Sequence, residues 1–132
     1  MFIFNKPPSR ALLVDGSSSD FLDNKEFSTA LNRIAEVIRK KVDVLVLDAC
    51  LMSSWEVLSE LNTSTSCVVC SVDELSGTGF NIAGAVYEMK NSLNYSPVNI
   101  AQTFPKQFRP KNDTDTCIAI NLDSNDWIEA ER

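Results

Sequence analysis

The sequence predicts one α/β domain over residues 1–132, built on a mostly parallel sheet with helices on both faces. The chain has the length of one domain, and 44% of its residues are hydrophobic, which is sufficient for a core. Short apolar runs alternate with segments of helical periodicity, the order typical of a parallel sheet. The runs are almost continuously apolar, as expected of strands that are covered on both faces.

The first third of the chain predicts a strand and a helix. Residues 10–15, RALLVD, form an apolar run that ends in a glycine and three serines, which indicates a buried strand followed by a loop. Residues 20–25 are polar. A helix is expected next, with Asp23 or Ser28 as its N-cap. Four apolar residues recur there at helical spacing: Phe27, Leu31, Ile34 and Ile38.

The middle of the chain predicts two strands around a helix. The strands are expected at residues 42–48 and 66–72, and the helix at residues 52–61. Residues 73–79, DELSGTG, indicate a loop because they include two glycines. The apolar residues expected along one side of this helix segment are Leu51, Trp55, Leu58 and Leu61.

The last third predicts three helices and one more strand. Helices are expected at residues 80–93 and, with a proline in its first turn, from Pro97 to about residue 108. The strand is expected at residues 116–122, before a helix capped by Ser124. Four strands are few for an α/β domain. We therefore expect an N-terminally incomplete fold, whose sheet is completed by a second chain or by a segment outside this sequence.

Charge and hydropathy exclude several classes of protein. The net charge of −6 argues against a nucleic-acid binder, because no basic stripe would offset the phosphates. No apolar run approaches the ~18 residues of a membrane span. Residues 1–10 have one short apolar patch and lack the apolar core of a secretory signal, so the default expectation is a cytoplasmic protein.

Two of the four cysteines, Cys67 and Cys70, form a C-x-x-C pattern, which is found in metal and redox sites. The chain has no second pair of this kind and no histidine to complete a zinc site. The pair also lies within an apolar run, and free cysteine is a common core residue. We therefore interpret both as core cysteines and predict no metal site from the residues.

Polar side chains follow three of the predicted strands, at Asp15-Gly16, at Asp48 with Cys50, and at residues 71–74. Sites in open α/β sheets form beyond the carboxyl ends of strands. We expect these three strands to be parallel neighbours, with the strand ending at Asp48 in the centre. Cys50 would then lie near the N-terminus of the next helix, where free N–H groups favour a thiolate. Two alternatives remain open. Cys50 is a buried structural cysteine, or Asp48 only stabilises the N-terminus of the helix and binds no substrate.

Residues 48–61, DACLMSSWEVLSEL, closely resemble the nucleophile motif of the clostripain-like cysteine peptidases, approximately D-x-C-L-M-x-x-x-E-V-x-x-E-L. Residues 71–74 and 77–80 resemble that family's S-x-x-E and G-x-G-[WF] segment. Residues 12–17, LLVDGS, resemble the strand that ends in its histidine-glycine motif. Residues 116–123 resemble a later strand. The order and the approximate spacing agree over most of the chain.

The resemblance implies a three-layer caspase/haemoglobinase-like fold with a cysteine–histidine dyad at the strand ends. It implies that Cys50 is the nucleophile and that Asp48 is the acid that pairs with an arginine or lysine of the substrate, a pairing that suits a carboxylate. Ser71 and Glu74 are the further candidates for the wall of this substrate pocket. Calcium is suggested by the resemblance only, and no other cofactor is expected.

The chain departs from the family at the histidine. Asp15 occupies the position of the dyad histidine, and the Gly16 N–H is a candidate oxyanion donor. A carboxylate cannot accept and return a proton near pH 7 as an imidazole does. Activity is therefore left open among three hypotheses. The domain is degenerate and binds peptides with basic side chains, or it is an active peptidase whose histidine comes from another chain or segment, or it is a general α/β interaction domain.

Overall fold

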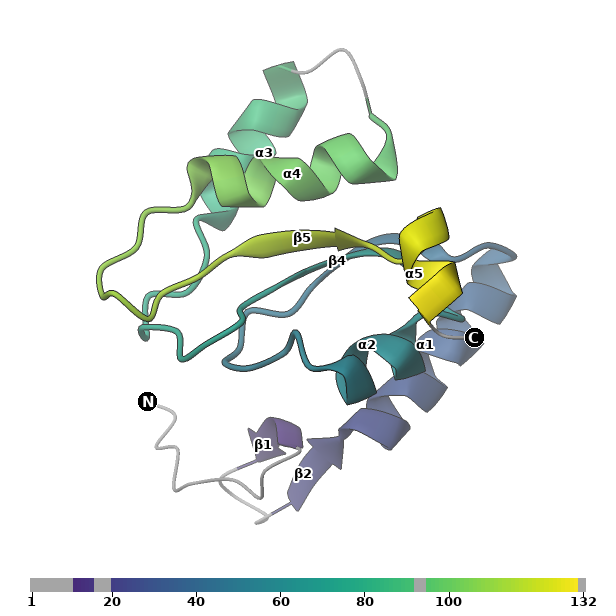
Figure 1. Ribbon diagram of the computed structural model, residues 1–132. Helices are drawn as coiled ribbons and strands as arrows, with labels where there is room; N and C mark the ends of the chain where they lie inside the picture. The colour runs from purple at the N-terminus through teal and green to yellow at the C-terminus, as the bar shows by residue number, and fades with distance from the viewer. Residues whose placement is uncertain (1–10, 16–19, 92–94, 131–132) are drawn as a thin grey trace.

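The computed structural model describes residues 11–15, 20–91 and 95–130 (Figure 1). Its main sheet contains β3 (Val42–Val46), β4 (Thr65–Cys70) and β5 (Ile118–Asn121), in the order β3-β4-β5. β3 and β4 are parallel, whereas β5 is antiparallel to β4. The parallel pairing of the strands before Asp48 and Ser71 is therefore confirmed. The prediction that β3 is central is wrong, because β4 lies between the other two strands.

The N-terminal strand does not join this sheet in the described part of the chain. β1 (Ala11–Asp15) pairs antiparallel with β2 (Asp20–Asp23), and together they form a separate two-stranded sheet. The prediction that the strand ending at Asp15 is a parallel neighbour of β3 is therefore wrong. A short connection favours a local hairpin, because parallel strands need a long crossover. β2 has four residues, DFLD, and is too short and too polar for the sequence to have indicated a strand that pairs with β1.

α1 (Asn24–Ile38) begins at a reciprocal cap. The Glu26 backbone N–H donates to Asp23 Oδ1 at 2.8 Å, and the Asp23 N–H donates to Glu26 Oε2 at 3.2 Å. This capping box satisfies two N–H groups that the first turn leaves without partners, and it confirms Asp23 as the N-cap. Leu31 is buried, but Ile34 and Ile38 are exposed, so only the first half of the predicted apolar stripe faces the core.

The helices cover both faces of the main sheet (Figure 1). α1 and α2 (Trp55–Leu61) lie on one face together with α5 (Asn125–Ala130), whose Trp127 packs against the core of that face. α3 (Ile82–Asn91) and α4 (Pro97–Gln107) pack against each other on the opposite face. None of the described helices is long and apolar enough to cross a membrane. The helix–sheet–helix arrangement confirms the three-layer prediction.

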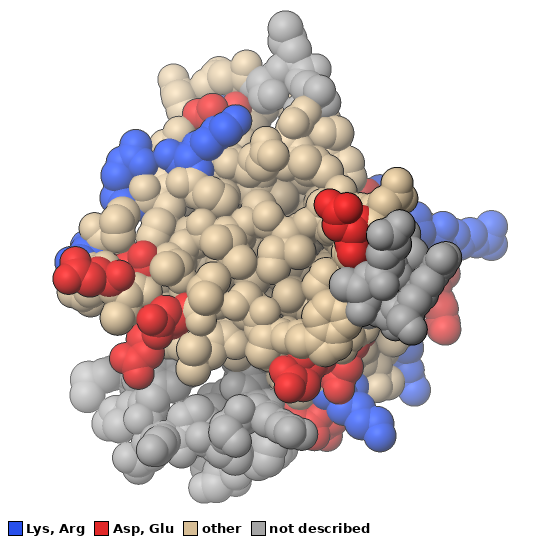
Figure 2. All heavy atoms as spheres, viewed as in Figure 1, with Lys and Arg blue, Asp and Glu red and all other residues tan. Residues whose placement is uncertain are grey.

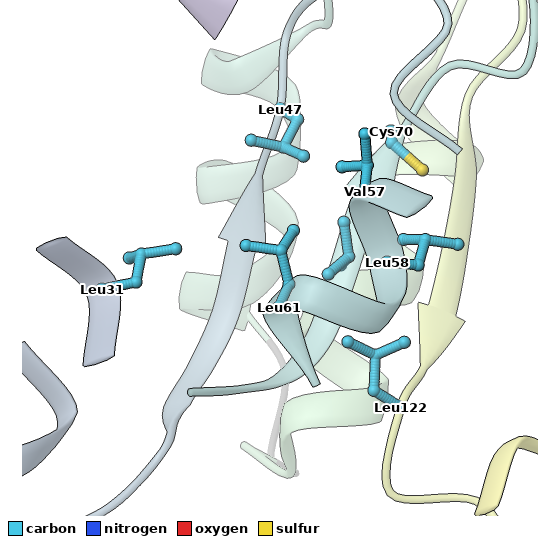
Figure 3. Packing of buried hydrophobic residues seen from close by; sticks show 8 residues of the cluster. Leu31, Leu47, Val57, Leu58, Leu61, Cys70 and Leu122 are labelled. Atoms are coloured by element: carbon cyan, nitrogen blue, oxygen red, sulfur yellow. The ribbon is translucent and has the colours of Figure 1, made fainter. Parts of the chain in front are cut away.

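Alternate residues of β4 serve two separate cores. Val68 and Cys70 belong to the cluster under α1 and α2, shown in Figure 3, whereas Cys67 and Val69 belong to the cluster under α3 and α4. Successive side chains of a strand point to opposite faces, so residues three apart also diverge. Cys67 and Cys70 are both buried and free, which confirms them as core cysteines.

α2 begins later than predicted and is turned differently toward the sheet. Its first residue is Trp55, with Ser54 at the N-cap, whereas the sequence predicted a start at residue 52. Leu51 is 57% exposed and Trp55 is 46% exposed, so neither lies in the buried seam. The buried residues of the helix are Val57, Leu58 and Leu61 (Figure 3). The cause of the later start is local: Ser54 has extended backbone angles, φ −64° and ψ 149°, so no helix can run through it from residue 52.

Candidate functional site

Three loops meet beyond the carboxyl ends of β3 and β4, and we call this region the corner: residues 47–51, 71–80 and 109–117. The Leu51 N–H donates to the Asp73 carbonyl at 3.3 Å, which joins the first loop to the second. The hydroxyls of Ser71 and Thr116 lie 2.8 Å apart, which joins the second to the third. The third loop reaches this edge because β5 is antiparallel and begins where β4 ends.

Cys50 is an exposed free thiol at the corner. Its Sγ accepts a hydrogen bond from the Leu75 N–H at 3.2 Å and lies 3.8 Å from the Leu75 carbonyl oxygen, to which it can donate. The sequence predicted an amide environment from the N-terminus of the next helix. The structure corrects this, because α2 begins five residues after Cys50 and the amide contact comes from the loop after β4.

The residue after Cys50 has an unusual backbone conformation. Leu51 lies in the left-handed region, which is uncommon for a residue with a Cβ and is found preferentially at functional sites. Its N–H is held by the Asp73 carbonyl. The strained turn and this hydrogen bond fix the path of the chain immediately after the thiol.

Asp48 explains the glycine that lies opposite it. Asp48 Oδ1 accepts a hydrogen bond from the Phe80 N–H at 3.0 Å. Gly79 has a φ of +62°, and a Cβ placed on it would lie 2.7 Å from Asp48 Oδ1. Glycine is thus required both for the backbone conformation and for the space. Asp48 remains exposed, and a carboxylate that accepts one hydrogen bond can accept others.

Ser71 and Glu74 occupy different environments. Ser71 is fully buried, and its hydroxyl donates to the Asp73 carbonyl at 2.9 Å besides contacting Thr116. Both of these hydroxyl contacts are therefore with other residues of the corner. Glu74 is exposed at the corner, where its N–H donates to Asp73 Oδ1 at 2.7 Å. The role of these two residues in binding a substrate stays a prediction.

Asp15 is the last residue of β1, and β1 belongs to the hairpin with β2. The main sheet therefore does not bring Asp15 to the corner, as the predicted parallel pairing would have done. Gly16 lies outside the described residues, so its predicted role as an oxyanion donor stays a prediction. The structure brings together Asp48, Cys50, Ser71 and Glu74, which follow the two strands that are indeed parallel.

The other thiols differ from Cys50 in their surroundings. Burial raises the pKa of Cys70 to about 12. Burial, and next the charge of Asp48, raise the pKa of Cys117 to about 11. Burial is also the main cause that raises the pKa of Cys67. These three side chains are neutral thiols near pH 7 and are poor nucleophiles, because the thiolate is the reactive form.

Sequence reasoning missed two residues that organise the corner, Asp115 and Thr116. Asp115 is buried and accepts hydrogen bonds from the N–H groups of Lys111, Asn112 and Ser76. The bond from Lys111 contributes most to lowering the pKa of Asp115 to about 2. The Thr116 hydroxyl accepts from two backbone N–H groups of the second loop. The available signal was weak: a polar loop that runs directly into a strand.

The surface around the corner is acidic. Its loops contain four exposed acidic residues, Asp48, Asp73, Glu74 and Asp113, and two exposed basic residues, Arg109 and Lys111, so acids predominate. In Figure 2 the acidic side chains on the left of the view lie on the side where these loops run in Figure 1. Within the described residues, no group of three or more histidine, cysteine, aspartate or glutamate side chains is arranged to hold a metal ion. The acidic surface is suited to attract a cationic ligand.

The model of the clostripain family matches residues 4–126. No curated protein sequence matches the chain. The solved structures that are similar to it in fold include the following two. A cysteine protease of B. fragilis has a TM-score of 0.54 at 23% identity, and a clostripain of Bacteroides thetaiotaomicron, in complex with the peptide inhibitor BTN-VLTK-AOMK, has a TM-score of 0.60 at 19% identity.

These matches cover most of the chain but less than half of either relative. The B. fragilis comparison covers 71% of the chain and 36% of the relative. The B. thetaiotaomicron comparison covers 83% of the chain and 47% of the relative. They confirm the predicted caspase-like α/β fold and the resemblance that the motif of residues 48–61 carried.

Proposed function

Since the chain belongs to the clostripain family, we propose that it is a peptidase-like domain that binds peptides through a basic side chain and does not hydrolyse them by itself. Its fold presents at one corner a cysteine, the nucleophile position of the family, and an aspartate, whose charge suits a basic side chain of a peptide. The hydrolytic step needs in addition a group that takes a proton from the thiol and gives one to the leaving amine.

The proposal is supported above all by one observation: the chain has an exposed thiol at the nucleophile position but contains no histidine. Cys50 is exposed, whereas the sequence of 132 residues contains no imidazole. Asp15, which stands at the expected histidine position, ends a hairpin strand outside the main sheet. Among the described residues, the hydrogen bonds of Cys50 Sγ are to the backbone of Leu75, which cannot act as a base.

Asp48 supports the choice of a basic side chain. It is exposed, it lies at the end of β3 near the nucleophile position, and the Phe80 N–H fixes one of its oxygens. A carboxylate held in this way can form a charge-assisted bond with a guanidinium or ammonium group. The net charge of −6 favours the approach of such a peptide. The peptide part of the inhibitor bound to the B. thetaiotaomicron relative, VLTK, ends in lysine.

The test is peptide binding by fluorescence anisotropy. A labelled peptide ending in VLTK is titrated with the wild-type chain, with Asp48→Asn and with Asp126→Asn, a matched change at an exposed acid on α5. Loss of the charged partner should weaken binding by about tenfold or more in Asp48→Asn, with no effect of Asp126→Asn. Equal binding by Asp48→Asn, or equal binding of a peptide with norleucine in place of lysine, would contradict the proposal.

A second candidate function is that of an active peptidase whose histidine is supplied by another chain or segment. The observation that favours it is the exposed edge of the sheet. β3 pairs with β4 on one side and with no described strand on the other, although four of its five residues are apolar. Natural proteins cover or charge such an edge. The solved relatives are more than twice as long as their matched parts, so they contain further chain that the comparison does not match.

This second function is tested on the native protein by size-exclusion chromatography of an extract of its source cells. The chain should elute within a larger species that cleaves lysyl or arginyl substrates, and the activity should disappear when Cys50→Ala replaces the wild-type chain. Elution at the size of the free chain, or activity that survives Cys50→Ala, would contradict it.

A further inference from the structure

One peptide group lies between Cys50 and the buried carboxylate of Asp115. This group joins the Leu75 carbonyl to the Ser76 nitrogen. The Ser76 N–H donates to Asp115 Oδ1 at 2.6 Å, and the Leu75 carbonyl oxygen lies 3.8 Å from Cys50 Sγ. In a trans peptide the N–H and the C=O point in opposite directions. The hydrogen bond to Asp115 on one side therefore directs the carbonyl toward Cys50 on the other.

The same loop residue also gives the sulfur a donor. The Leu75 N–H lies 3.2 Å from Cys50 Sγ, so both backbone groups of Leu75 contact the thiol. An amide donor stabilises negative charge on a sulfur atom, because a hydrogen bond to an ionised acceptor is stronger than one to a neutral acceptor. The orientation of the Leu75 N–H and carbonyl groups thus affects the reactivity of Cys50.

Asp115 is itself firmly held. It is 7% exposed, and its Oδ2 accepts from the N–H groups of Lys111 at 2.7 Å and Asn112 at 3.0 Å. These bonds, that of Lys111 first, lower the pKa of Asp115 to about 2, so the group is ionised throughout the neutral range. The Asp115 carboxylate is therefore held in place by its own loop. Through its hydrogen bond from the Ser76 N–H it can orient the peptide group of residues 75–76.

The neighbouring residue supports the other end of that loop. Thr116 Oγ1 accepts from the Val72 N–H at 2.9 Å and from the Asp73 N–H at 3.3 Å. The Asp73 carbonyl in turn accepts from the Leu51 N–H. Two successive residues before β5 thus reach both sides of Cys50 through the loop, one through Leu75 and one through Leu51.

From these contacts we infer that Asp115 is a positioning residue for Cys50, which it orients through the Leu75–Ser76 peptide group without touching the sulfur. The inference rests on the proposed function where it treats Cys50 as the nucleophile position. The contacts themselves do not depend on that function. Asp115→Asn replaces one acceptor oxygen by an amino group facing N–H donors, and so removes at least one of the three hydrogen bonds.

The experiment measures the alkylation rate of each cysteine by iodoacetamide and mass spectrometry, in the full chain at pH 7.5. Asp115→Asn is compared with the wild type and with Asp113→Asn, a matched change at an exposed acid of the same loop. We expect alkylation of Cys50 to slow by about three- to tenfold in Asp115→Asn, since the sulfur loses a well-placed donor. Cys67 and Cys70, which are buried in the two cores and report on their opening, should keep their wild-type rates, and Asp113→Asn should change nothing.

An unchanged or faster rate at Cys50 in Asp115→Asn would overturn the inference, as would faster alkylation of all thiols together, which would indicate a purely structural role. If the variant does not fold, hydrogen exchange of the wild type decides. The amides of Leu75 and Ser76 should be protected relative to those of Gly77 and Thr78, and equal exchange would overturn the inference. Neither measurement requires peptide binding or turnover, so failure here and failure of the proposed function are distinguishable.

Discussion

β4 and the corner beyond it are adjacent in the chain but are organised differently. Five of the six residues of β4 are buried, and four of them belong to the two cores on opposite faces of the sheet. Past Ser71 the chain is mostly exposed, and its path is fixed by hydrogen bonds from backbone N–H groups to Asp48, Asp115 and Thr116. Side-chain packing thus stabilises β4, whereas hydrogen bonds fix the backbone conformation of the corner.

The largest expected effect of this difference is on the reactivity of the thiols. Cys50 belongs to the corner, whereas Cys67 and Cys70 belong to the strand. In the wild-type chain at pH 7.5, Cys50 should react with iodoacetamide more than about 1000-fold faster than Cys70, because burial suppresses both access and thiolate formation. Site-resolved mass spectrometry gives the rates. Comparable rates would show that the strand opens readily and that the two regions do not differ as described.

The packed region is tested by Leu61→Ala. Leu61 is 1% exposed and lies in the cluster of Figure 3, so its truncation should lower the free energy of unfolding by about 2–5 kcal/mol. Val37→Ala, at a residue that is 81% exposed on α1, is the control and should stay within about 0.5 kcal/mol of the wild type. Urea unfolding measures both. A small effect at Leu61 would place the buried face of α2 elsewhere.

The hydrogen-bonded region is tested by Gly79→Ala. The added Cβ meets the Asp48 carboxylate and occupies a backbone conformation that L residues rarely adopt, so we expect a loss of about 1–3 kcal/mol in the free energy of unfolding. Binding of the VLTK peptide should weaken as well, because Asp48 must move. Gly77→Ala meets nothing within 4 Å and should be nearly neutral. If both alanines behave alike, the contact between Gly79 and Asp48 does not shape the corner.

The smallest effect concerns pH. Burial raises the pKa of Cys70 from its ordinary value of 9.0 to about 12. Above pH 9 the unfolded chain releases this proton while the folded chain keeps it. The stabilisation is therefore complete below pH 9 and falls as the pH rises toward 12, by about 1 kcal/mol per pH unit. Cys117, which is only partly buried, should contribute less.

This pH dependence is measured by urea unfolding at pH 8.5 and pH 10.5. The decrease in the free energy of unfolding should be smaller in Cys70→Ala than in the wild type, whatever stability the variant loses at pH 8.5. An equal decrease would show that Cys70 is not a source of the alkaline instability.

The sequence was sufficient where a property is local. The proline suited to a first turn indicated α4, the apolar run indicated β4, and the lack of further metal ligands indicated that Cys67 and Cys70 are core residues. The motif around Cys50 placed the thiol and Asp48 at the ends of parallel strands, because neighbouring parallel strands end at the same edge.

The sequence was insufficient where a property depends on distant partners. Whether β1 joins the main sheet or pairs with β2 is decided by competition between pairings, which the apolar pattern of either strand does not reveal. The order of the strands in the sheet has the same origin. The sequence signal for Asp115 was weak, because the backbone N–H groups of Lys111 and Asn112 become its partners only when the loop folds around its carboxylate.

The most direct test of the account is the hydrolysis of a fluorogenic lysyl or arginyl peptide by the purified chain, measured beside Cys50→Ala and Asp15→His. We predict no turnover by the wild type, which retains the nucleophile position and lacks the base. We also predict none by Asp15→His, because β1 does not carry this residue to the corner through the main sheet. Turnover by the wild-type chain that disappears in Cys50→Ala would contradict the account.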